Sequence, residues 1–222
     1  KQFTCAAIMM LKERGLLDYD EPIERFFPDF PDYRKYVTIR DMMTHVSGIQ
    51  EYFEENKWLN IPDSATADTK RMLEIIKGFG DLTFKPRTQY SYCNSSYVML
   101  GNIVEQLSGM SFGEFLKKNI FQPLGMEHTI APDYMDVKGE NLTEGYVKDA
   151  DGNFVKQNYN MALVGYADGN IQSTVDDLFI WHQYLYMSDS ELILKRESLA
   201  EAFKNNYLLD GTATGYGFGF FL

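Results

Sequence analysis

The chain has 222 residues, of which 45% are hydrophobic and 15% aromatic, enough to build a folded core and too many for intrinsic disorder. Its 32 acidic residues outnumber the 21 basic ones, and the formal net charge of −11 argues against the basic face that a nucleic-acid partner requires. The longest apolar run, Cys5 to Leu11, is far shorter than the ~20 residues of a membrane-spanning helix.

The first part of the chain is predicted to be helical with short breaks. Gly15 ends the first helix, because glycine adopts the left-handed conformation without steric penalty, and Thr38 with Asp41 forms a capping-box-like start. Residues 51–65 have no clear period and are predicted to be irregular. The predicted helices are Lys1–Arg14, Pro22–Phe27, Ile39–His45, Thr69–Lys77, Ser95–Leu107 and Phe112–Phe121.

Beyond residue 125 the composition changes, with many Gly, Asn, Asp and Tyr residues. Two β-like pieces, Glu144–Lys148 and Phe154–Gln157, flank a turn at residues 151–153 and predict a hairpin. Thr174 is a predicted N-cap for the next helix. The predicted elements that follow are helices Val175–Met187 and Arg196–Lys204 and a strand Gly215–Phe221.

Three residues form a candidate catalytic group: Lys1 at the start of the first helix, and Tyr92 and Asn94 just before another helix. A lysine of lowered pKa accepts a proton from a serine nucleophile, and a tyrosine near an ammonium shuttles it. Asn94 offers an amide that orients the lysine or holds a substrate carbonyl. The structural alternatives are a solvated Lys1, a Tyr92 packed beneath a turn and an Asn94 that caps the helix, alone or in addition to a site role.

Seven stretches of the chain, in order, resemble the recurrent segments of one family. They are 1–17, 20–23, 38–49, 90–101, 120–126, 168–178 and 215–220. With these segments the chain resembles the serine β-lactamase and penicillin-binding family, in the group of class C β-lactamases, D-alanyl-D-alanine carboxypeptidases and esterases. The resemblance implies that Lys1 is the lysine of a Ser-x-x-Lys motif, Tyr92 the general base and Asn94 its partner.

The resemblance also implies the fold class, an α/β (α+β) fold with an antiparallel sheet flanked by helices and joined to a helical region. We expect residues 1–222 to form a single domain of this type, incomplete at both ends, and helix-rich because the terminal strands are missing. The serine three residues before Lys1 is absent, and so is a third motif after Leu222. Many family members have Pro-Gly where this chain has Pro86-Arg87, so we expect the turn there to differ.

The expected function is that of a serine hydrolase acting on amide, ester or β-lactam bonds through an acyl-enzyme, with the chain as given inactive. The alternative is a non-catalytic fragment or pseudo-enzyme that binds peptidoglycan-like ligands or a partner. The expected ligand is a small-molecule or peptidoglycan-like substrate, with no cofactor, no metal and no nucleic acid. The resemblance suggests a periplasmic or extracellular location, and the oligomeric state is open.

Other reactive side chains are predicted to be structural. His45 is expected to be a structural histidine near a helix end, and Ser47 lies in no Gly-x-Ser-x-Gly elbow. Cys5 and Cys93 are expected to be buried and inert. The three histidines lack metal-ligand spacing, so a zinc site is not expected.

Overall fold

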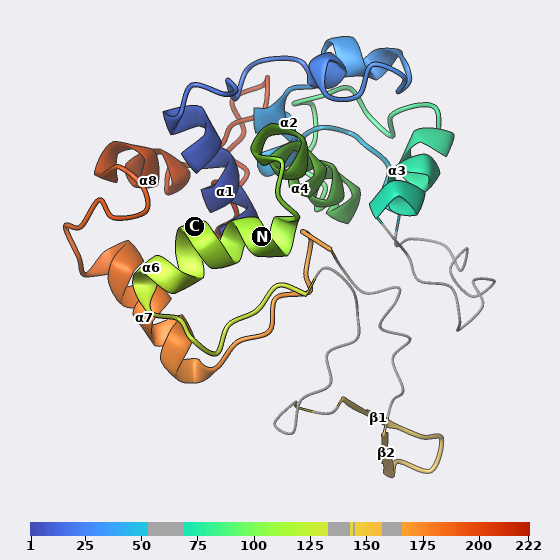
Figure 1. Cartoon of the computed structure of the whole chain (residues 1–222). Coiled ribbons are helices and arrows are strands. Elements are labelled where there is room, and N and C mark those ends of the chain that lie inside the picture. Colours follow the sequence, from blue (N-terminus) through green and yellow to red (C-terminus); the bar gives the residue numbers. More distant parts are fainter. Residues whose placement is uncertain (53–68, 133–142, 144, 157–165) are drawn as a thin grey trace.

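The computed structural model describes residues 1–52, 69–132, 143, 145–156 and 166–222. Helices predominate in this part of the chain (Figure 1), as predicted, beside one two-stranded sheet. The α-helices are α1 Gln2–Glu13, α2 Ile39–Met43, α3 Thr69–Gly78, α4 Asn94–Ser108, α5 Phe112–Leu116, α6 Gln122–Leu124, α7 Val175–Tyr186 and α8 Arg196–Ala202. The other elements are the 3-10 helices η1 Ile23–Arg25 and η2 Asp32–Lys35, the π-helix η4 Lys117–Phe121, and the strands β1 Tyr146–Lys148 and β2 Phe154–Lys156.

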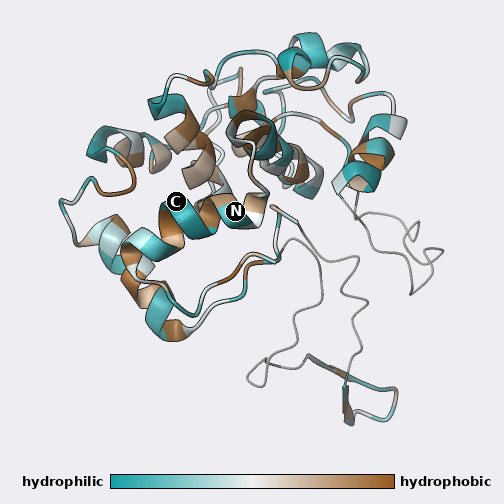
Figure 2. Cartoon of the chain, in the orientation of Figure 1, coloured by the Kyte–Doolittle hydropathy of each residue, from teal (hydrophilic) through white to brown (hydrophobic). Residues whose placement is uncertain are grey.

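Helix α1 lies in the core. Every residue from Phe3 to Leu11 is buried, because the sequence there is apolar on all sides and a helix of this kind needs protein around its whole circumference. It packs against α4, and Figure 2 shows α1 as hydrophobic over most of its length and hydrophilic at one end. Trp181 of α7 covers its first turn, with its indole N–H donating to Gln2 Oε1 at 2.9 Å.

Helix α4 approaches the segment 166–168 closely at Gly101. A Cβ atom at this position would lie 2.3 Å from Ala167 Cβ and 2.6 Å from Tyr166 Cε1, so only glycine fits. The segment is thereby held against α4, and Thr4 of α1 donates to the Ala167 carbonyl at 2.6 Å from the other side. Both helices that carry predicted site residues therefore contact the same short segment.

Several local predictions are confirmed. The capping box predicted at Thr38 is formed, and Thr174 caps α7 by accepting from Asp177 N–H. A second capping box is formed at Ser111. Strands β1 and β2 pair antiparallel around Gly152, whose φ is 84°. In Figure 1 this hairpin stands apart from the helices. Most of the predicted irregular stretch, residues 53–65, lies outside the described residues, as do Glu144 and Gln157.

Other predictions are wrong. The N-cap of α4 is Cys93, and Asn94 is the first helical residue, so the Asn94 side chain does not cap the helix. The predicted helix Phe112–Phe121, by contrast, is helical over its whole length, as α5 followed directly by the π-helix η4. The α2 helix ends at Met43, and His45 lies beyond it with φ at 60°, which a continuing helix does not allow.

The predicted strand Gly215–Phe221 is also wrong. Gly219 has φ at 82°, and Gly217 N–H donates to the Phe220 carbonyl at 2.9 Å, so the segment turns back on itself. An isolated bridge pairs Tyr216 with Phe221. The glycines that alternate with aromatic residues here serve a tight turn, which a period of two does not distinguish from a strand.

Candidate active site

The three residues predicted to form the site meet at the start of α1. Lys1 Nζ donates to Asn94 Oδ1 at 2.6 Å and to the Asp168 carbonyl at 2.8 Å. It also lies 4.6 Å from the centre of the Tyr92 ring, within the range of a cation–π contact. Helix α1, the loop before α4, α4 itself and the segment 166–168 thus bring together groups that are up to 167 positions apart.

The environment of Lys1 favours a less basic amine. Burial lowers the pKa of the Lys1 ammonium, because the charged form loses hydration, while the nearby carboxylates of Asp168 and Glu51 act in the opposite direction. Burial is the largest of these effects. A lysine of this kind is closer to the state in which its neutral amine accepts a proton.

Tyr92 lies on the loop before α4 and is 44% exposed. Its ring packs on His45, with ring centres 4.3 Å apart, and lies parallel to the ring of Phe221 at 6.4 Å. Partial burial raises the pKa of the Tyr92 phenol, with smaller contributions from Tyr90 and the carboxylates of Asp168 and Glu51. This environment therefore disfavours the phenolate form of Tyr92.

Two site residues were missed by the sequence reasoning. Asp168 has its backbone carbonyl on Lys1, while its carboxylate accepts from the Tyr52 hydroxyl at 2.6 Å and from Tyr166 N–H at 2.8 Å. Glu51 Oε2 accepts from the backbone N–H of Asn94 at 2.5 Å. Asp168 opens one of the family-like segments, which was an available signal, whereas nothing in the sequence marks Glu51.

His45 is fully buried, and each of its ring nitrogens has a hydrogen-bond partner. Nδ1 accepts from Cys93 N–H at 3.0 Å, and Nε2 lies 3.3 Å from the Tyr216 hydroxyl. Burial, reinforced by the charge of Lys1, lowers the pKa of His45 to about 3. The ring is therefore neutral and has no nitrogen free for catalysis, in agreement with the predicted structural role.

The remaining reactive side chains are also buried. Ser47 is 1% exposed, with its Oγ 3.1 Å from Ser96 Oγ, so it does not face a substrate. Both cysteines are free and buried, and desolvation raises the pKa of Cys5 to about 12 and that of Cys93 to about 11. Inert thiols at both positions were predicted. Among the described residues no group of three His, Cys, Asp or Glu side chains is placed to hold a metal ion.

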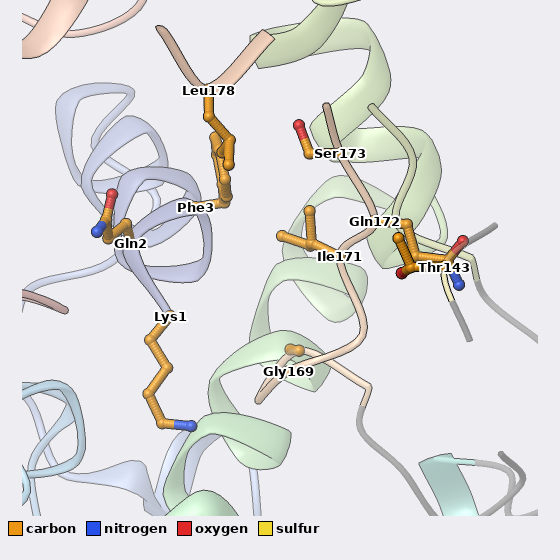
Figure 3. Close-up of a pocket in the computed structure, with 10 residues that line it drawn as sticks. Lys1, Gln2, Phe3, Thr143, Gly169, Ile171, Gln172, Ser173 and Leu178 are labelled. Carbon is orange, nitrogen blue, oxygen red and sulfur yellow. The ribbon is translucent and has the colours of Figure 1, made fainter. Parts of the chain in front are cut away.

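A cavity of about 710 Å³ opens beside Lys1. Figure 3 shows the first turn of α1, with Lys1 and Phe3, on one side and the segment with Gly169 and Ile171 on the other. Lys1 is one of the residues that line this space. None of the described helices is long and apolar enough to cross a membrane.

Comparison with known proteins identifies the family of the chain. The family model described as Beta-lactamase matches residues 1–222. Penicillin-binding protein 4* of Bacillus subtilis (strain 168) is 33% identical over 241 residues, which cover 100% of this chain and 50% of that protein. A D-aminopeptidase of Brucella anthropi is 27% identical, covering 99% of this chain and 40% of that protein. The chain thus spans half the length of these curated relatives or less.

Solved structures agree on the fold. The octameric penicillin-binding protein homologue from Pyrococcus abyssi matches 98% of this chain and 50% of its own, with a TM-score of 0.77 and 28% identity. The penicillin-binding protein from Bacillus halodurans matches 98% of this chain and 65% of its own, with a TM-score of 0.79 and 26% identity. The fold class predicted from the sequence is confirmed. That residues 1–222 form a single domain stays a prediction.

Proposed function

The chain belongs to the Beta-lactamase family, and we propose that the whole protein is a serine hydrolase that cleaves an amide, ester or β-lactam bond through an acyl-enzyme. The observation that carries the proposal is the contact of Lys1 Nζ with Asn94 Oδ1 at 2.6 Å, beside the ring of Tyr92. A partly desolvated amine, a phenol and an amide then share one site, and these are groups that acyl transfer uses for proton movement.

The lowered pKa of Lys1 and the position of Tyr92 suggest a division of roles. Lys1, whose pKa is lowered, takes the proton of a serine hydroxyl, and Asn94 holds the lysine in place. Tyr92, whose ring lies 4.6 Å from Lys1 Nζ, relays a proton to the leaving group and recovers one from the Lys1 ammonium. The proposal requires a serine three residues before Lys1 in the whole protein, one helical turn away.

The substrate class is proposed from the relatives. They are named as penicillin-binding protein and D-aminopeptidase, which favours an amide next to a D-amino acid or a peptidoglycan-like peptide. The cavity beside Lys1, about 710 Å³ in volume, falls within the range of small-molecule sites. A substrate of this kind implies a location in the periplasm or outside the cell.

The test is covalent labelling of the whole protein with a fluorescent penicillin and with a fluorophosphonate. We expect labelling by at least one probe, and a loss of roughly 10²-fold or more in rate for Lys1→Met, because general-base catalysis is removed. Lys12→Met is the matched control, since Lys12 lies at the other end of α1 in an ion pair with Asp18. It should label like the natural protein.

Two results would contradict the proposal. One is a natural gene without a serine three codons before Lys1, and the other is a folded whole protein that takes up neither probe. Either result would favour the alternative, a non-catalytic protein that binds peptidoglycan-like ligands. Labelling of the 222-residue chain by itself would instead show that the nucleophile lies within residues 1–222.

A further inference from the structure

The N-terminus of α4 has no side-chain cap of its own. Its N-cap is Cys93, which makes no capping hydrogen bond, although the first N–H groups of any helix lack partners within it. The carboxylate of Glu51, 43 positions earlier, accepts the N–H of Asn94 at 2.5 Å. A carboxylate is well suited to this place, because it meets both an unpaired donor and the positive end of the helix dipole.

Glu51 is held in position by its neighbours on both sides. The Gln50 carbonyl accepts from the Ser95 hydroxyl at 2.6 Å, and Tyr52 N–H donates to the same Ser95 oxygen at 2.8 Å. The segment 50–52 is therefore fastened to the first turn of α4 by backbone atoms that flank Glu51. These two hydrogen bonds fix the backbone on both sides of Glu51 and so keep its carboxylate at the N-terminus of α4.

This arrangement has a consequence for Asn94. An asparagine at the start of a helix commonly spends its side-chain oxygen on the backbone. Here Asn94 is one residue past the N-cap, and its side-chain oxygen accepts from Lys1 Nζ at 2.6 Å. Asn94 is thus joined to Glu51 through its backbone and to Lys1 through its side chain.

We propose that Glu51 is a positioning residue of the active site, which binds the backbone N–H of Asn94 at the start of α4 and so holds the Asn94 amide on Lys1. The inference rests on the proposed function, in that Lys1 is taken as the group that moves the proton. Glu51 has no role in bond making. Its effect on the reaction passes through Asn94 and through the field of its charge at Lys1.

The charge of Glu51 adds a measurable signature. The charged and titratable groups that face Lys1 are Asp168, Glu51, Cys93, Cys5 and the neutral ring of His45, with the rings of Tyr92 and Tyr97 against the ammonium. Asp168 and Glu51 oppose the lowering of the Lys1 pKa by burial. Removing the Glu51 charge therefore lowers the pKa of Lys1 further, whereas a residue that acts only on folding leaves it unchanged.

The experiment compares Glu51→Gln and Glu51→Ala in the whole protein. Glutamine keeps an oxygen that accepts the Asn94 N–H and removes the charge, so its labelling rate should stay within a few-fold of the natural protein while Lys1 titrates at lower pH. Alanine removes both functions, and we expect a 10- to 100-fold slower reaction with the fluorescent penicillin, since small misplacements of a catalytic group cost this much. Gln50→Ala is the control, because the Gln50 side chain donates to the Asp81 carbonyl.

The titration of Lys1 is followed by NMR of ¹³C-labelled lysine, assigned with Lys1→Arg, and does not depend on activity. Thermal melts check that each variant is folded, and Glu51→Gln alone decides the matter if Glu51→Ala does not fold. A Glu51→Gln protein in which Lys1 titrates as in the natural protein would overturn the inference, as would a folded Glu51→Ala protein with an unchanged reaction rate. Failure of the natural protein to label would reject the proposed function instead.

Discussion

Single residues in this chain show how burial divides chemical roles between groups that lie close together. The same desolvation lowers the pKa of Lys1 and raises that of Tyr92, because each is pushed toward its neutral form. The residue types were visible in the sequence. The direction of each pKa shift depends on burial, and burial is a property of the fold.

Arg87 gives a prediction at this scale. Its φ is 64°, so the Pro86-Arg87 turn has the left-handed conformation that glycine favours, and the side chain pairs with buried Asp41 at 3.4 Å. Both Arg87→Gly and Arg87→Ala lose this ion pair, and the comparison isolates the backbone. We expect the glycine variant to be more stable than the alanine variant by about 1 kcal/mol in urea unfolding, because the left-handed conformation penalises a Cβ atom.

The matched control for Arg87 is exposed Lys70 in α3. There Lys70→Ala should be more stable than Lys70→Gly by about 1 kcal/mol, the usual order for a helix. The same order at both positions would contradict the assignment of backbone strain to Arg87.

At the scale of elements, the caps predicted at Thr38 and Thr174 are confirmed, whereas the predicted N-cap of α4 and the predicted strand at residues 215–221 are wrong. The capping boxes are satisfied within a few residues, so the sequence alone specifies them. The cap of α4 is different, since Glu51 supplies it from 43 positions away. The fold of residues 215–221 is likewise set by left-handed glycines and by what the aromatic rings contact.

Gly101 in α4 provides the prediction for this scale. Gly101→Ala would force a methyl group into Ala167 and Tyr166. This would displace the segment 166–168, in which the backbone carbonyl of Asp168 accepts from Lys1. We expect a loss of roughly 1–3 kcal/mol in the free energy of unfolding, as for overpacked cores, together with slower labelling of the whole protein. Gly78→Ala is the control, since a Cβ there meets no atom within 4 Å. Equal free energies of unfolding for Gly101→Ala and Gly78→Ala would show that α4 and residues 166–167 move apart to accept the methyl group.

On the scale of the whole molecule, the site is assembled from α1, the loop before α4, α4 and the segment 166–168. Polar side chains beneath the site are buried, and His45 among them is 0% exposed. Enclosing a titratable group links the global stability to pH, because the unfolded chain binds protons that the folded chain does not.

His45 predicts the direction of this dependence. Its pKa is lowered from 6.5 to about 3 on folding, so below pH 6.5 the unfolded state takes up a proton that the native state refuses. Stability should therefore fall as the pH is lowered from about 6.5 toward 3, with a contribution of up to about 1.4 kcal/mol per pH unit. Urea unfolding of His45→Asn, whose side chain tolerates positive φ, should lack this contribution. The exposed His128→Asn variant should retain it, and identical pH dependence in all three proteins would contradict the account.

The sequence by itself determined the family, the fold class, most helices and the three residues Lys1, Tyr92 and Asn94, because motif order and local capping are properties of neighbouring residues. Only the tertiary structure decided that Asn94 holds Lys1 while Glu51 caps α4, and that the Asp168 carbonyl completes the lysine's contacts. The physical reason is that hydrogen bonds across 43 to 167 positions, and the desolvation that sets each pKa, arise only when distant segments pack together.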